Sequence, residues 1–235
     1  METNVVQLAV HEKLWVWSEA HRKEVIWGSL IIVVVGVGIG FVIWQRNETE
    51  TRANEALSAI VSSGTPGNEQ VASAESLLKV AGEYKKTAAG ARALLLAAGD
   101  LYVRKQFAES RSTFDRFLRE YRDSPLADQA LLGVAACLDA QGKIPEAITA
   151  YKDIVQHYSA QNVSPQAKLA LATLYERQGN WAPAKDLYLD LTRGSYGAFT
   201  SEAGVHLEAL FSKHPELIPQ RSASTNFSAI AAPSR

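Results

Sequence analysis

The chain has 235 residues, and its 24 Lys and Arg side chains nearly balance 25 Asp and Glu, giving a formal net charge of −1. A neutral balance provides no basic surface for a phosphate backbone, so we expect no nucleic acid among the partners. The only cysteine, Cys137, excludes an intramolecular disulfide. Its place between Ala136 and Leu138 indicates a packed small residue rather than a reactive thiol.

Residues 1–24 read as a short charged arm, helical from about Val10, that carries Trp15 and Trp17. A charged, Trp-bearing stretch ahead of an apolar segment is typical of an anchor at a membrane surface.

Residues 25–45 are predicted to be a single transmembrane helix. Val25 to Trp44 is a run of twenty residues without a charge, enough to cross about 30 Å of hydrocarbon. Trp27 and Trp44 lie near its two ends, where aromatic rings prefer the headgroup level. The alternative is a cleaved signal peptide, but the apolar region is too long for one, begins late and is not promptly followed by an Ala-x-Ala site.

Gly36 and Gly40 have the spacing of a small-residue face on which a transmembrane helix packs, which would allow self-association. The alternative is that glycine is simply common in membrane spans. A dinucleotide-binding loop is disfavoured, because these glycines follow no strand and no acidic residue follows at the required distance.

The charges beside the span favour a cytoplasmic N-terminus. Lys13, Arg22 and Lys23 precede the span, whereas Arg46 and Arg52 follow it. We therefore expect a single-pass membrane protein whose C-terminal domain lies outside the cytoplasm.

Four apolar or small positions recur at intervals of 37 residues. Each set reads large, small, large, large at offsets 0, 3, 7 and 10, which is one face of an α-helix. The four series are Phe107, Ile144 and Trp181; Ser110, Ala147 and Ala184; Phe114, Tyr151 and Tyr188; and Phe117, Ile154 and Leu191. Ahead of each set lies a small–x–x–large step: Ala98/Leu101, Ala135/Leu138 and Ala172/Tyr175.

Lys105, Gly142 and Gly179 stand two residues before each set, where glycine would permit the left-handed turn that ends a helix. Two helices per unit, a tight turn and a fixed period predict an all-α fold, an α-solenoid of paired helices. An ordinary helical bundle with chance spacing is the alternative.

The repeats resemble the tetratricopeptide repeat, best in the unit Leu171-Ala172-x-x-Tyr175-x-x-x-Gly179-x-x-x-x-Ala184-x-x-x-Tyr188. The closing proline of that family is missing, and the unit containing Lys105 and Ser110 is degenerate. We expect pairs at 88–121, 125–158 and 164–193, with Ser124-Pro125 and Ser164-Pro165 starting the second and third.

Further helices are expected over 47–62, 71–83 and 200–213, the first two separated by a break at 63–67 and the last covering the end of the stack. The repeat domain should thus occupy 46–215, and the polar 216–235 should be a disordered tail.

The resemblance implies a protein-binding groove lined by the first helix of each pair. Position by position it comprises Arg92, Leu95, Gly99 and Tyr102; Gln129, Leu132, Ala136 and Asp139; and Gln166, Leu169, Thr173 and Glu176. A carboxylate clamp needs Lys, Asn and Arg along these rows, so a mixed apolar and polar groove for an extended or helical segment fits better. Some of these residues would instead contact the neighbouring repeat.

No catalytic, metal or cofactor motif accompanies these features in the sequence, so we expect no enzyme, no cofactor and no metal.

The arm and span resemble one bacterial family, the ancillary subunit of the Sec translocon. The matching residues are Leu14-Trp15-x-Trp17-x-x-x-His21-x-Lys23-x-x-x-Trp27-Gly28, then Gly36, Gly40 and Trp44. The resemblance implies a non-enzymatic protein of the cell inner membrane with a periplasmic C-terminal domain. Its partners would be the translocon and a membrane-anchored periplasmic chaperone. The alternative is a structural scaffold or assembly factor of the cell envelope or division machinery.

Overall fold

The computed structural model describes residues 15, 17, 21–62, 73–158 and 163–218. Within these ranges the chain forms nine α-helices and one short 3-10 helix, with no strand. The helices are α2 (Arg22–Ser62), α3 (Ala74–Glu83), α4 (Ala88–Val103), α5 (Phe107–Glu120), α6 (Ala127–Ala140), α7 (Ile144–His157), α8 (Val163–Arg177), α9 (Trp181–Arg193) and α10 (Ala198–Lys213), followed by η1 (Pro215–Leu217). The all-α prediction is confirmed.

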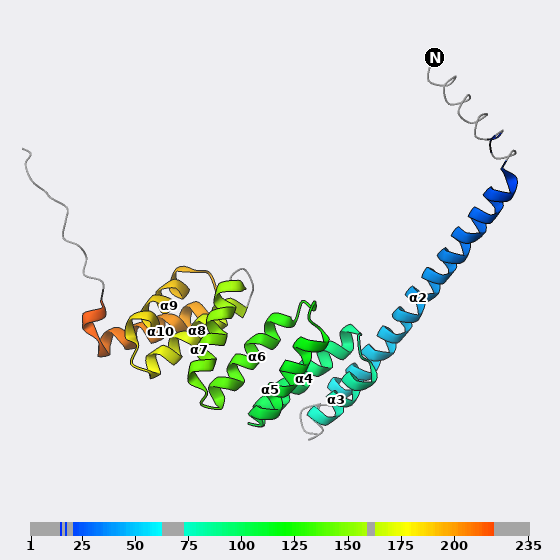
Figure 1. The fold of residues 1–235 in the computed structure, drawn as a ribbon. Helices are drawn as coiled ribbons and strands as arrows, with labels where there is room; N and C mark the ends of the chain where they lie inside the picture. The colour runs from blue at the N-terminus through cyan, green and yellow to red at the C-terminus, as the bar shows by residue number, and fades with distance from the viewer. Residues whose placement is uncertain (1–14, 16, 18–20, 63–72, 159–162, 219–235) are drawn as a thin grey trace, which may run out of the picture. The chain divides into compact units, whose positions relative to one another are not determined.

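The chain divides into two compact units, Met1–Ala93 and Leu94–Arg235, with the boundary inside α4. In the first unit the predicted span and the helix that follows it are one continuous helix, α2 (Figure 1). The distal part of α2 packs on α3. Ala53 and Leu57 on α2 and Leu77 on α3 are buried. Ser73 caps α3 by accepting a hydrogen bond from the Ser76 amide at 3.3 Å.

The apolar side chains of the proximal part of α2 are not buried by any other described part of the chain. Apolar side chains from Ile26 to Trp44 are about half to three-quarters exposed, and no part of the most apolar window is buried. The most apolar window of the segment Ser29–Ser62 has a mean hydropathy of 1.9. By length and composition alone, this segment could cross a membrane. The window differs in this respect from the core helix of a soluble domain, which the rest of the same chain would mostly bury.

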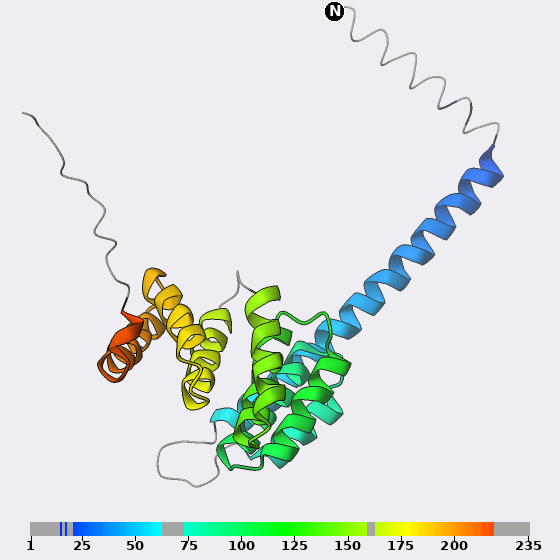
Figure 2. The same cartoon turned by 60° about the vertical axis from the view of Figure 1, so that its left-hand side comes forward.

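In the second unit, successive helices from α5 to α10 pack on one another, as Figures 1 and 2 show. One core cluster joins α6, α7 and α8 around Tyr151, Ile154 and Leu174. A second joins α8, α9 and α10 around Tyr188 and Leu191. Leu217 packs against this second cluster, so the packed part of the chain extends past the predicted boundary at 215.

The three turns between paired helices are built identically. Lys105, Gly142 and Gly179 are all left-handed, with φ of 62°, 74° and 73°. In each turn the amide of this residue donates to the carbonyl three residues back, and the next amide donates to the carbonyl five residues back, at 2.9 to 3.0 Å. This is the Schellman motif, which satisfies carbonyls left open at a helix end. Lys105 adopts the glycine conformation although it carries a Cβ.

The small residue at the helix crossing is fully buried in all three helix pairs: Ser110, Ala147 and Ala184 have no exposed surface. Ser110 stands where the other two repeats have alanine, and its hydroxyl is fully hydrogen-bonded. Its hydroxyl donates to the carbonyl of Ala98 at 2.7 Å and accepts the thiol of Cys137 at 3.2 Å. The first repeat is therefore degenerate in sequence but regular in structure.

The predicted serine caps are wrong. Helix α6 begins at Ala127, and Ser124 instead accepts a hydrogen bond from the amide of Leu126 within the preceding turn. Ser164 lies inside the first turn of α8, where it is buried and its hydroxyl has no hydrogen-bond partner among the described residues. The predicted break at 63–67, the arm except Trp15, Trp17 and residues 21–24, and the tail from 219 lie outside the described residues.

Candidate protein-binding surface

The predicted groove positions fall on the first helix of each pair, α4, α6 and α8. On α4, Arg92 is exposed and belongs to the first unit, whereas Leu95, Gly99 and Tyr102 are half-buried in the second. Leu96 and Val103, which the repeat pattern does not select, are the strongly exposed apolar side chains of this helix, at 47% and 79%.

Helices α6 and α8 contact each other directly, which brings their rows together. Gln129 and Gln166 are exposed, whereas Leu132 is half-buried against the cluster around Tyr151. Leu169 is only 8% exposed and packs in the cluster around Tyr188, so it offers little surface to a partner. Ala136 and Thr173 are half-buried between these positions.

The acidic residue of the α6 row is paired within the domain. Asp139 forms a salt bridge with Arg177 at the end of α8. The pair joins the ends of two successive first helices, and its carboxylate is the less exposed member. A bound segment therefore meets a neutralised charge here rather than a free carboxylate.

Glu176, the acidic residue of the α8 row, is also held internally. It accepts a hydrogen bond from the Tyr188 hydroxyl at 3.0 Å and lies 3.5 Å from Nδ1 of His206 on α10. The rings of Tyr188 and His206 stack with centroids 5.2 Å apart. Burial, then the hydrogen bond to Glu176, raises the pKa of Tyr188, so the phenol stays protonated and donates. The repeat pattern aligns Tyr188 as a core position and gives no signal for His206.

Tyr102, the last residue of the α4 row, packs edge-on against Phe107 with centroids 5.3 Å apart. Burial raises its pKa, and the nearby Cys137 and Asp139 raise it further. Its hydroxyl is consequently a neutral hydrogen-bonding group at physiological pH.

Apart from the exposed Arg92, these observations describe a surface whose side chains are neutral or paired within the domain. In the described ranges, no group of three or more His, Cys, Asp or Glu side chains could hold a metal ion. Such a surface offers apolar contact and amide hydrogen bonds rather than acid–base chemistry.

The predicted packing positions on α2, Gly36 and Gly40, are uncovered. A Cβ built at either one meets nothing within 4 Å among the described residues. A neighbouring span could therefore approach this face closely.

Comparison with protein families gives two matches. A model described as a tetratricopeptide repeat-like domain matches residues 16–149, and a tetratricopeptide repeat model matches residues 166–193. The first covers the apolar helix, α3, the α4–α5 pair and α6, and ends within α7, and the second covers nearly all of the α8–α9 pair. Comparison with curated proteins gives no match.

Proposed function

The chain belongs to the tetratricopeptide repeat-like family, whose domains mediate protein–protein interaction, and we propose that it is a single-pass membrane protein that presents this domain outside the cytoplasm. Helix α2 anchors it in the inner membrane, with the N-terminal arm in the cytoplasm. The domain binds protein segments near the translocon, with a membrane-anchored periplasmic chaperone as a partner. The role is non-enzymatic.

The proposal for the anchor rests on the exposure of α2. A helix with apolar side chains exposed on every side from Ile26 to Trp44 would be costly in water. In hydrocarbon the apolar side chains are no longer exposed to water, so that cost disappears. A helix is stable there because its backbone hydrogen bonds are internal. The span also matches the family model, which begins at residue 16.

The proposal for the binding surface rests on one observation, the internal pairing of its acidic residues. Asp139 is paired with Arg177, and Glu176 is held by Tyr188 and His206. The exposed Gln129 and Gln166 and the half-buried Leu132 then provide a neutral, partly apolar contact area. This suits an uncharged extended or helical segment better than an acidic C-terminus.

The surface is tested by adding positive charge to it. The full chain in detergent carrying Gln129→Arg with Gln166→Arg should bind an unfolded, uncharged polypeptide several-fold more weakly than the parent. Gln156→Arg with Thr149→Arg, at exposed positions of α7, provides the matched control. Equal loss in both double variants, or in neither, would place the binding surface elsewhere.

Partner recovery separates the proposal from the scaffold alternative. Affinity purification in mild detergent should recover translocon or periplasmic chaperone subunits. Recovery of envelope or division proteins, together with no binding of unfolded polypeptide, would favour an assembly factor.

A further inference from the structure

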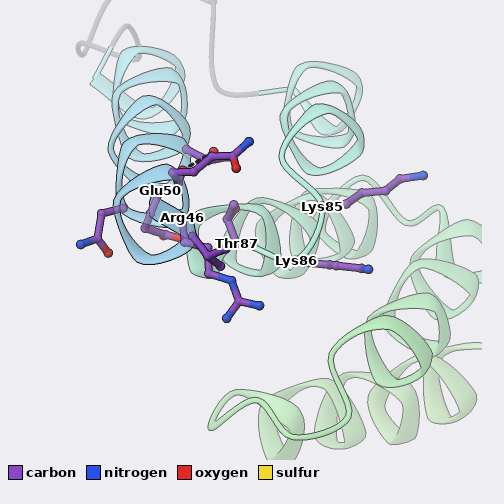
Figure 3. A pocket seen from close by; sticks show the side chains of 9 residues that line it. Arg46, Glu50, Lys85, Lys86 and Thr87 are labelled. Atoms are coloured by element: carbon purple, nitrogen blue, oxygen red, sulfur yellow. Dashed lines mark hydrogen bonds between the residues drawn. The ribbon is translucent and has the colours of Figure 1, made fainter. Parts of the chain in front are cut away.

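The turn between α3 and α4 lies against α2 where the apolar run ends. Val42, Arg46 and Glu50 on α2, with Lys85 and Thr87 in the turn, line a cleft of about 610 Å³ (Figure 3). All of these residues belong to the first unit.

Two hydrogen bonds fix the turn at this level. The carboxylate of Glu50 accepts from the amides of Ala88 and Ala89 at 2.9 and 3.0 Å, at the start of α4. These are amides that a helix start leaves without an internal partner, and a carboxylate complements the positive end of the helix. The two hydrogen bonds to Glu50 therefore hold the turn against α2.

The position of the turn along α2 brings it near the depth of the lipid headgroups when α2 spans a bilayer. Arg46 lies two positions beyond Trp44, about 3 Å along the helix axis, and Glu50 about 9 Å beyond it. Headgroups extend roughly 5 to 8 Å beyond the hydrocarbon on each side. By this measure Arg46 lies within that layer and Glu50 just beyond its outer edge, so the turn borders the headgroups, although it is about forty residues further along the sequence than Arg46.

The cations at this level form no ion pair with the carboxylates of the described residues. Arg46, Lys85 and Lys86 are exposed and take part in none of the ion pairs found among the described residues. Of the nearby acids, Glu48 pairs with Arg52 at 3.0 Å and Glu50 is occupied by backbone amides. Glu50 keeps its negative charge and the exposed Glu83 adds a second, so three cations against two carboxylates leave an excess of one positive charge at this level.

The three side chains are spread rather than convergent. In Figure 3 those of Lys85 and Lys86 extend away from Arg46 and do not meet it at a common point. This arrangement suits several phosphates of a lipid layer better than one enclosed phosphate.

We infer that Arg46, Lys85 and Lys86 form a basic collar that gathers anionic phospholipids around the outer end of α2, an inference that rests on the proposed anchoring of α2. Each Lys or Arg near an anionic membrane surface strengthens the attraction to that surface by about 1 kcal/mol, a factor of about five in the binding equilibrium. The three together should therefore enrich anionic over neutral lipid several-fold at the turn, and salt should weaken the enrichment.

The test uses the full chain in nanodiscs with a fluorophore at Gly82→Cys, on a Cys137→Ala background. Gly82 is exposed near the end of α3, and a Cβ there meets nothing within 4 Å. The quencher is a nitroxide near the headgroup end of the acyl chain, carried by phosphatidylglycerol in one sample and by phosphatidylcholine in the other. Phosphatidylglycerol should quench several-fold more strongly at low salt.

Two variants of equal charge change make the result specific. Replacing Arg46, Lys85 and Lys86 by Gln should make the two quenchers equivalent. Replacing the exposed Arg119, Lys143 and Lys213 by Gln should preserve the preference. A preference that survives the first set, or equal quenching in the parent, overturns the inference while leaving the anchor intact. No quenching by either lipid would instead overturn the membrane placement on which both proposals depend.

Discussion

Replacing Lys105 by glycine should stabilise the protein, because the first repeat turn uses a conformation that suits glycine. Lys105 has a φ of 62° and makes the same two turn hydrogen bonds as Gly142 and Gly179. Its Cβ serves no purpose in that turn, and its side chain is exposed. The substitution removes the strain and leaves the hydrogen bonds unchanged.

The magnitude follows from two opposing terms. A left-handed residue with a Cβ costs roughly 1–2 kcal/mol. Glycine loses more conformational freedom on folding, at a cost of roughly 0.5–1 kcal/mol. The difference predicts a gain of about 1 kcal/mol, which raises the thermal midpoint by about 2–4 °C for a chain of this length.

Circular dichroism at 222 nm (the helical signal) during heating of the full chain in detergent measures this shift. Lys105→Gln keeps the Cβ and removes the charge, so it should leave the midpoint unchanged. Gly142→Lys makes the reverse change in the next repeat and should lower the midpoint by a similar amount. A Lys105→Gly variant no more stable than Lys105→Gln would refute the equivalence of the three turns.

Three further changes test the packing. Gly133→Ala should destabilise the fold, since its Cβ would lie 2.4 Å from the Phe114 ring. Gly99→Ala has open space around its Cβ and should stabilise the fold by up to about 1 kcal/mol. Urea unfolding of the two variants measures both effects. Ala147→Leu should cost roughly 1–3 kcal/mol by overpacking the buried crossing, and an unchanged thermal midpoint would show that the repeat register is misplaced. Cys137 should resist maleimide at neutral pH until the chain unfolds, because burial raises the pKa of its thiol; rapid labelling of the native protein would contradict its buried position.

The repeated positions predicted the architecture because their spacing reports helix packing directly. Ala147 and Ala184 are buried at crossings, and Gly142 and Gly179 take the left-handed turn, as the pattern predicts. The left-handed Lys105 could be inferred only by aligning it with those glycines. Local sequence was less informative at helix starts, because the Ser124 hydroxyl accepts from the amide of Leu126 within the preceding turn and caps no helix.

The binding surface was only partly accessible to sequence. The pattern located the first helices of the pairs, but burial of Leu169 depends on how α8, α9 and α10 close around it. Contacts between distant segments, such as Glu176 with His206 and Glu50 with the start of α4, have no local signature. These long-range polar contacts are what determine which charges remain free.

Protease treatment of spheroplasts tests the central claim, a membrane-anchored repeat domain outside the cytoplasm, most directly. Added protease should degrade the domain from Asn47 onward and leave a membrane-embedded fragment that retains the N-terminal arm. Sequencing of the untreated protein should show that the apolar segment is still attached. A protected repeat domain would place it in the cytoplasm, and a mature N-terminus beyond Trp44 would show cleavage and release; either result would contradict the account.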